Sequence, residues 1–304
     1  MTASVRRGRS APTDEAPARV VTAKVSLARR LREILGARQL LVALVRKELK
    51  VKYKGSAVGF LWSMLNPAMY LVIFYVVFAT ILDNGIPLFP IWLLCGLLVW
   101  NFFSAVLPSA TVAIVGNGAL IKKVAFPREV LPLASVGAGL VHFALQGLVL
   151  LAGLIVFRHG VDPGFMLLVP YAVVTLVVLT SALAIFLSAV NVYVRDAQHL
   201  LDLALLGWFW MTPIIYPFRL ASDKLVEQGL PQWIFMLNPL TPIVTTFQRA
   251  IYNRTTVGEV KLLPEVGVGY HLVLLTALLA VSLVLLVAAM AVFRRVEGNF
   301  AEEL

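Results

Sequence analysis

Five cations stand directly before the first long apolar run of the chain, at a spacing that suits binding to anionic groups. Arg46, Lys47, Lys50, Lys52 and Lys54 fall within nine residues. Cations beside a membrane-spanning segment lie at the depth of lipid phosphates, where each contributes about 1 kcal/mol toward an anionic surface. The run therefore predicts contact with anionic lipid head groups on the cytoplasmic side of a membrane.

Residues that carry catalytic chemistry are scarce. The sequence has no GxxxxGK motif followed by Ser or Thr, so we expect no ATP-binding P-loop, and its four histidines and one cysteine form no metal-binding spacing. A membrane-embedded glycosyl- or acyltransferase would need acids or bases clustered at a membrane face, and the acids expected outside the membrane are scattered in loops. We expect a protein that is not an enzyme and that takes its energy from another subunit.

Two ionisable side chains, His142 and Asp202, lie in apolar runs. An ionisable group inside the membrane is by default a functional hypothesis. Asp202 is also close enough to the cytoplasmic edge to cap a helix or face water. His142, with Gln146 one turn on, also suits a hydrogen bond between helices. From the sequence, both interpretations of each residue stay open.

Composition places these residues in a membrane protein. Of 304 residues, 60% are hydrophobic and only 14% are charged, with a mean hydropathy of +0.88. Soluble domains have about 25% charged residues. The apolar residues gather in runs near the ~20 residues that a helix needs to cross a bilayer. The expected fold class is an all-α polytopic membrane protein with six transmembrane helices, at about 57–82, 90–115, 131–157, 166–194, 200–215 and 269–293.

One apolar segment, 230–253, is ambiguous. It carries Pro231, Pro239 and Pro242, so it is either a seventh crossing or a re-entrant helical hairpin, and charge counting does not separate the two. Broken backbone at membrane depth is tolerated against protein or water. We favour an external re-entrant hairpin before the last helix, which leaves both termini in the cytoplasm.

Charge asymmetry sets the expected orientation. Of the 26 Lys and Arg residues, 14 precede Ser56, and six crossings put 20 inside and 6 outside. This bias predicts a cytoplasmic N-terminus and explains the net charge of +10 without nucleic acid. The expected parts are a disordered cytoplasmic tail at 1–25, a basic amphipathic interfacial helix at 26–56 that bends or splits near Gly36, a six-helix transmembrane domain at 57–295 with a cytoplasmic loop at 116–130, and a cytoplasmic C-terminal tail at 296–304.

Four ordered stretches resemble a known family. "RKELKVKYKGS" at 46–56, followed by Gly59, Leu61, Trp62 and the "LNP" of 65–67, resembles the entry to the first transmembrane helix of polysaccharide-export permeases of the ATP-binding-cassette superfamily. The stretches 120–132, 193–217 and 237–252 are similar to the same family in the same order. The resemblance covers most of the chain after Leu40. A composition with 17 Arg to 9 Lys and many Ala and Val looks most like the actinobacterial members, which export a galactan.

The resemblance implies an architecture and a substrate. It implies a homodimer of six-helix permeases in the bacterial cell (inner or plasma) membrane, with two nucleotide-binding ATPase subunits on the cytoplasmic face. ATP and Mg²⁺ would belong to those partners, and no cofactor to this chain. The cargo would be a polysaccharide, a galactan or one like O-antigen, linked by pyrophosphate to a polyprenyl lipid. The alternatives are an exporter of a drug or small lipid in the same superfamily and, less favoured, a membrane-embedded transferase.

The resemblance also assigns roles to two basic segments. The five cations at 46–54 would capture the pyrophosphate head group, although general lipid anchoring explains the same charges. In the loop "KKVAFPREV", an apolar knob and flanking charges would dock the ATPase, although a solvated positive loop is the plainer interpretation. The expected coupling residues are Lys122, Lys123, Phe126, Pro127, Arg128 and Glu129.

A channel for a sugar polymer needs walls that contact the C–H faces of the sugars without binding them tightly. Aromatic side chains suit this because their contacts have little directional preference. For any single aromatic residue, contact with lipid or packing between helices is the favoured interpretation, whereas the aromatic residues as a group suit the lining of a channel. Asn66-Pro67 breaks the helix near the inner face and suits either a channel border or a packing kink. The expected channel-lining residues are Trp62, Asn66, Trp100, Phe102, Phe103, Trp208, Trp210 and Tyr216. The hairpin would form an external gate with Trp233, Phe235, Asn238, Pro239 and Pro242.

Overall fold

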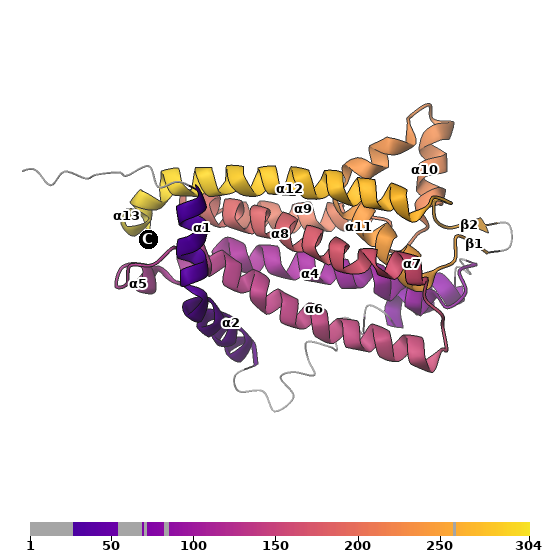
Figure 1. The fold of residues 1–304 in the computed structure, drawn as a ribbon, viewed down its shortest axis with the longest axis horizontal. Helices are drawn as coiled ribbons and strands as arrows, with labels where there is room; N and C mark the ends of the chain where they lie inside the picture. Colours follow the sequence, from indigo (N-terminus) through magenta and orange to yellow (C-terminus); the bar gives the residue numbers. More distant parts are fainter. Residues whose placement is uncertain (1–26, 54–68, 70–71, 82–84, 258–259) are drawn as a thin grey trace, which may run out of the picture.

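The computed structural model is a bundle of long helices that lie side by side (Figure 1). It describes residues 27–53, 69, 72–81, 85–257 and 260–304. Apolar residues on all sides of these helices favour burial against one another or in lipid, and few polar side chains interrupt them. The long helices are α4 (Phe89–Gly116), α6 (Val130–Val156), α8 (Leu168–Tyr193) and α12 (Val268–Val296).

Four helical stretches in the described part of the chain are long and apolar enough to cross a membrane. They are Phe89–Gly116, Val130–Val156, Pro163–Tyr193 and Val268–Asn299. They confirm four of the six expected crossings. The first expected crossing, 57–82, lies mostly outside the described residues. The fifth corresponds to α9 (Ala197–Met211), whose 15 residues fall short of the ~20 that a crossing needs. The total of six crossings stays a prediction.

Shorter elements connect the long helices. They are α5 (Gly118–Ile121), α7 (Pro163–Met166), α10 (Phe218–Glu227), α11 (Leu240–Phe247) and α13 (Phe300–Glu303), the π-helical turns η1 (Tyr75–Ile81) and η3 (Gln248–Tyr252), the 3₁₀ turns η2 (Gln232–Leu237) and η4 (Glu297–Asn299), and a two-stranded antiparallel sheet of β1 (Thr256–Val257) and β2 (Val260–Lys261).

The bundle has two distinct ends, visible in Figure 1. We call the end that holds α5 and α13 the α5 end, and the opposite end, with α7, β1 and β2, the α7 end. Two buried apolar clusters fill the bundle. The larger is built around α4, with Trp92 and Phe103 fully enclosed, and the smaller lies at the α5 end, with Leu44 and Phe300.

The N-terminal helix is divided, as its sequence predicted. Helix α1 (Leu27–Gly36) is followed after Ala37 by α2 (Arg38–Tyr53). Helix α1 crosses the α5 end at a steep angle to the bundle, and α2 packs along α6 (Figure 1). The contact with α6 is close because Gly137 has no side chain: a Cβ there would lie 2.7 Å from Cγ2 of Val45.

The segment 230–253 folds into η2, α11 and η3, and the last two have eight and five residues. At 1.5 Å per residue they are together shorter than the ~30 Å hydrocarbon core of a bilayer. The amide hydrogen of Asp162, at the start of α7, bonds to the carbonyl oxygen of Ala250 at 2.9 Å, so the end of this segment lies at the α7 end.

Candidate functional site

An arginine from α1 joins three separate parts of the chain at the α5 end. Nε and Nη2 of Arg30 donate to the two carboxylate oxygens of Glu129 at 2.7 and 2.8 Å. Nη2 also donates to Oε2 of Glu297 at 2.6 Å. The Glu129 side chain has 0% exposure and that of Arg30 has 14%. A two-pronged pairing of guanidinium with carboxylate is the strongest kind of ion pair, so this contact fixes α1 and η4 to the loop before α6.

The loop and the C-terminal segment make further contacts. The Arg128 guanidinium donates to the backbone carbonyl of Glu297 and lies 5.8 Å from the centre of the Phe300 ring. Phe300 is fully buried and packs edge-on against Phe293 of α12. Burial alone lowers the pKa of Arg30, but its hydrogen bond to Glu129 and the charges of Glu129 and Glu297 outweigh it, so the pKa of Arg30 is raised. Arg30 is therefore held as a permanent cation.

A groove of about 500 Å³ opens beside this cluster. Its walls come from α1, from the loop 121–128 and from η4, with Arg30, Phe126 and Glu297 among its lining residues. We call it the α5 groove. Its rim carries exposed side chains, Lys122, Lys123 and Val124. The groove combines the exposed ammonium groups of Lys122 and Lys123 with apolar side chains such as Phe126, a mixed surface suited to a partner protein.

The structure divides the six expected coupling residues into three pairs. Lys122 and Lys123 are exposed, and Phe126 and Pro127 are half-buried. Arg128 and Glu129 point inward, to the C-terminal segment and to Arg30. Arg128 is half-buried and also lines the α5 groove, whereas Glu129 is enclosed, so five of the six residues present surface to a partner and Arg128 and Glu129 also hold the loop in place.

The five cations expected to bind a head group are only partly within the described residues. Arg46 and Lys50 are exposed on α2. Lys47 Nζ donates to Oδ1 of Asn117 at 2.8 Å, which ties α2 to the start of α5. The side chain of Lys52 and all of Lys54 lie outside the described residues. Lys47 thus makes a contact that positions α2, in addition to its expected role in binding a head group.

The expected channel aromatics are mostly interior. Trp100, Phe102 and Phe103 are buried in α4 with exposures of 8%, 3% and 0%. The rings of Phe103 and Trp208 meet edge-on, 5.0 Å apart. A residue enclosed in this way can line a passage only after its neighbouring helices move. Trp210 of α9 is 54% exposed, while Trp62 and Asn66 lie outside the described residues.

Asn238 links the expected channel and gate residues. Its Oδ1 accepts from Nε1 of Trp208 at 2.9 Å, and its Nδ2 donates to Oγ1 of Thr212 at 2.9 Å and to the carbonyl of Met211 at 3.1 Å. The chain leaves helical form after Met211, and its freed carbonyls need partners at depth. Asn238 supplies one of them, and Gln248 Nε2 supplies another by donating to the carbonyl of Pro213 at 3.1 Å.

The other gate residues lie around this link. Trp233 is 62% exposed, and the Phe235 ring packs edge-on against Tyr216 at 6.4 Å. Pro239 is half-buried before α11, and Pro242 is buried inside it. Tyr216, expected in the channel, donates its hydroxyl to the carbonyl of Trp210 at 2.8 Å. The structure thus brings Tyr216 together with Phe235 of the segment 230–253.

Sequence reasoning missed Arg30, Glu297 and Phe300. It placed Arg30 among many helical cations and residues 296–304 in a tail. The available signal was weak: an acid and an aromatic residue follow a pair of arginines at the end of an apolar helix. By contrast, the expected interhelical role of the 142–146 turn is confirmed for Gln146, whose Oε1 accepts from Nδ2 of Asn101 at 3.1 Å.

Known proteins match the chain over most of its length. Residues 39–252 match the ABC-2 type transporter family. An O-antigen export system permease protein RfbA of Myxococcus xanthus is 34% identical, covering 91% of this chain and 99% of its own. One from Klebsiella pneumoniae is 30% identical, over 87% and 95%. The polysialic acid transport protein KpsM of Escherichia coli is 24% identical, over 69% and 80%.

The family match and the apolar helices agree. A match over 39–252 covers every element from α2 to η3, including the loop at the α5 groove and the segment 230–252. Together with four helices suited to cross a membrane, it makes the chain an integral membrane protein. It is a member of the ABC-2 type transporter family.

Proposed function

We propose that the chain is the permease subunit of an ABC exporter that moves a polyprenyl-pyrophosphate-linked polysaccharide across a bacterial cell membrane. The observation that carries the proposal is the 34% identity to an O-antigen export permease over 99% of that protein's length. Similarity over nearly the full length of that protein supports a shared function. A galactan is the proposed cargo within this class, on the basis of composition.

The α5 end is the proposed cytoplasmic end, where partner ATPases would dock. The α5 groove supports this because its exposed lysines and the apolar side chains of Val124 and Phe126 lie on one loop, and Arg30 and Glu129 hold that loop against α1. A push on a loop that is tied to α1 and to the C-terminal segment moves these three parts together. Two copies of the chain would form the passage, and two ATPase subunits would bind ATP and Mg²⁺.

The substrate path follows from the same orientation. Arg46, Lys50 and their neighbours on α2 would meet the pyrophosphate at the inner surface, since phosphate oxygens pair well with several cations. The Trp208–Asn238 hydrogen bond supports an external gate, because it joins the aromatic residues of α9 to the hairpin. Opening the proposed gate would break the three hydrogen bonds of Asn238 with Trp208, Met211 and Thr212.

The docking step is tested by a double variant, Lys123→Gln with Phe126→Ala, in vesicles that hold the chain and its ATPase. We expect at least about a tenfold loss of ATPase stimulation, because one charge contact and one apolar contact are worth about 1.4 kcal/mol together. The matched control is Leu220→Ala with Lys224→Gln on α10, which removes the same kinds of side chain at the opposite end.

The cargo is tested in the same vesicles by ATP-driven movement of a polyprenyl-pyrophosphate glycan. A small drug or a short lipid serves as the competing substrate. Movement of the drug without movement of the glycan would contradict the proposed cargo. Unchanged ATPase stimulation in the Lys123–Phe126 variant would contradict the proposed docking surface, whatever the cargo.

A further inference from the structure

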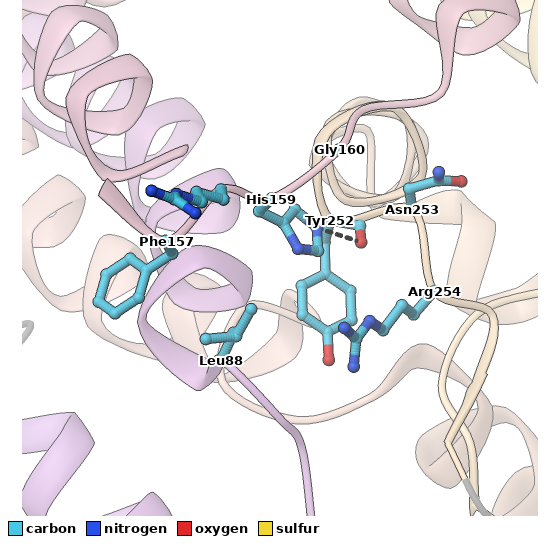
Figure 2. Close-up of a pocket in the computed structure, with 8 residues that line it drawn as sticks. Leu88, Phe157, His159, Gly160, Tyr252, Asn253 and Arg254 are labelled. Carbon is cyan, nitrogen blue, oxygen red and sulfur yellow. Dashed lines mark hydrogen bonds between the residues drawn. The ribbon is translucent and has the colours of Figure 1, made fainter. Parts of the chain in front are cut away.

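A second pocket lies at the α7 end, far from the α5 groove. It has a volume of about 270 Å³ and is lined by the loop 157–160 that follows α6, the segment 252–254 that ends η3, and Leu88 before α4. Figure 2 shows His159 and Tyr252 at its centre, with Arg254 beside them. Three separate chain segments therefore converge on one small opening. We call it the arginine pocket.

The pocket is cationic. Arg158 and Arg254 both line it and both are exposed, and no carboxylate is among its lining residues. Within the described part of the chain neither arginine makes an ion pair, although Arg249 at the same end pairs with Asp162 at 3.6 Å and lies 4.5 Å from the centre of the Phe165 ring. The nearby acid is thus already used, and two guanidinium groups remain for an anion from outside the chain.

The floor of the pocket is held rigidly. His159 Nε2 lies 2.8 Å from the carbonyl oxygen of Tyr252, and the two rings stack with centres 5.7 Å apart. The Tyr252 hydroxyl donates to the carbonyl of Pro87 at 2.7 Å. These contacts link all three segments. A floor that is already ordered adds little entropic cost when a ligand binds.

The backbone around the pocket is strained. Leu88, Arg158 and Asn253 have φ of 51°, 49° and 58°, and they are the three non-glycine residues with positive φ in the described chain. All three line the pocket. Left-handed backbone is unfavourable for a residue with a Cβ, more so for Leu and Arg than for Asn. Strain of this kind gathers at ligand sites, where the surrounding structure holds it in place.

Arg158 occupies a position where glycine is most favourable. It follows Phe157, the C-cap of α6, and the amide hydrogen of His159 closes the helix end on the carbonyl of Leu154 at 2.9 Å. Helices that end in this way usually have glycine at the left-handed residue. For the backbone, arginine is less favourable than glycine at this position. The Arg158 side chain is therefore a candidate for binding a ligand.

The surface next to the arginines is apolar. Ile155, Val156 and Phe157 are 69%, 75% and 50% exposed at the end of α6. A ligand that reaches Arg158 therefore lies beside side chains that favour a hydrocarbon chain. Guanidinium groups bind phosphate through two parallel hydrogen bonds, which an ammonium group does not do. Phosphate and hydrocarbon together describe a lipid head group.

We propose that the arginine pocket binds the phosphate or pyrophosphate group of a lipid at the α7 end, with the lipid chain against the end of α6. Two lipids carry this chemistry: a polyprenyl pyrophosphate and an ordinary anionic phospholipid. The binding does not depend on transport or on the ATPase. It is therefore tested separately from the proposed export activity.

The test is calorimetric titration of the full chain in detergent with farnesyl pyrophosphate, phosphatidylglycerol and inorganic pyrophosphate. We expect Arg158→Gln and Arg254→Gln each to weaken lipid binding about tenfold, since each variant loses charge-assisted hydrogen bonds to the phosphate. The charge-matched control, Lys224→Gln on α10, leaves binding unchanged. Changing both arginines to lysine restores less than half of the lost affinity, because ammonium groups lack the two-pronged geometry.

The three probes distinguish the possible sources of the phosphate group. Arginine-dependent binding of farnesyl pyrophosphate above phosphatidylglycerol assigns the prenyl lipid, and the reverse order assigns the phospholipid. Tighter binding of inorganic pyrophosphate than of either lipid overturns the lipid assignment. If no probe binds, or if binding ignores both arginines, the site is wrong. Should the glutamine variants misfold, Arg158→Gly decides instead, because glycine suits the left-handed backbone there: unchanged lipid binding in that variant would contradict the site.

Discussion

The two ends of the bundle use arginine in opposite ways. At the α5 end Arg30 is nearly buried and holds three carboxylates, those of Glu33, Glu129 and Glu297. At the α7 end Arg158 and Arg254 are exposed in a pocket without carboxylates, and Arg158 lies on left-handed backbone. An arginine whose charge is neutralised inside the chain serves the fold, whereas one left beside a pocket is available to a ligand. The two settings predict opposite responses to substitution.

Substitution of Arg30 is expected to have the largest effect. Arg30→Gln leaves Glu129, which is fully buried, without its cation, and removing one partner of a buried pair costs about 3 kcal/mol or more. The midpoint of thermal unfolding in detergent measures this loss. The matched control is the neighbouring Arg29→Gln: its side chain is 70% exposed and pairs with Glu33 at 3.4 Å, so it contributes under about 1 kcal/mol. Equal losses in the two variants would remove the distinction between a buried and an exposed arginine.

Substitution of Arg158 by glycine is expected to stabilise the protein. Arg158→Gly relieves a left-handed residue at the end of α6 and raises the free energy of unfolding by about 1 kcal/mol. The same variant loses the lipid binding proposed above. As a control, Arg295→Gly places glycine inside α12 and destabilises by about 1 kcal/mol. A fall in stability for Arg158→Gly would show that its side chain supports the fold, like that of Arg30.

A carboxylate that is not paired with Arg30, that of Glu48, extends the comparison at the α5 end. Glu48 of α2 accepts from the Ser135 hydroxyl at 3.0 Å, and burial raises its pKa despite that bond and the charge of Lys47. Because its pKa is higher in the folded chain than in the unfolded chain, its contribution to stability is full at low pH and is lost as pH rises through the raised value. Glu48→Gln is therefore expected to gain stability relative to wild type as pH rises. This is the smallest of the three expected effects, and it is checked by measuring unfolding midpoints of both proteins across pH 4 to 8. A relative gain that grows toward low pH would contradict the assignment.

Several features were predictable from the sequence because they rest on local patterns. Runs of apolar residues determine which segments cross a membrane, and four of the expected crossings match helices of sufficient length and hydropathy. The break near Gly36 follows from the low helix propensity of glycine. The Gln146 hydrogen bond follows from the cost of leaving an amide unpaired between helices.

The paired residues were not predictable because they are far apart in the chain. Arg30 lies 99 residues from Glu129 and 267 from Glu297. No spacing rule joins residues at such distances, and each is an ordinary surface residue by type. The arginine pocket likewise needs three segments that meet at one end of the bundle, and its strained backbone is visible only in the folded chain.

By itself, the amino-acid sequence determined that this is a membrane protein, which segments are basic, and which family the chain resembles. These features rest on hydropathy and short motifs, which are properties of neighbouring residues. The tertiary structure alone decided which charged residues hold the fold and which stay free. That choice depends on burial and on the distance between side chains, which arise only when the helices pack.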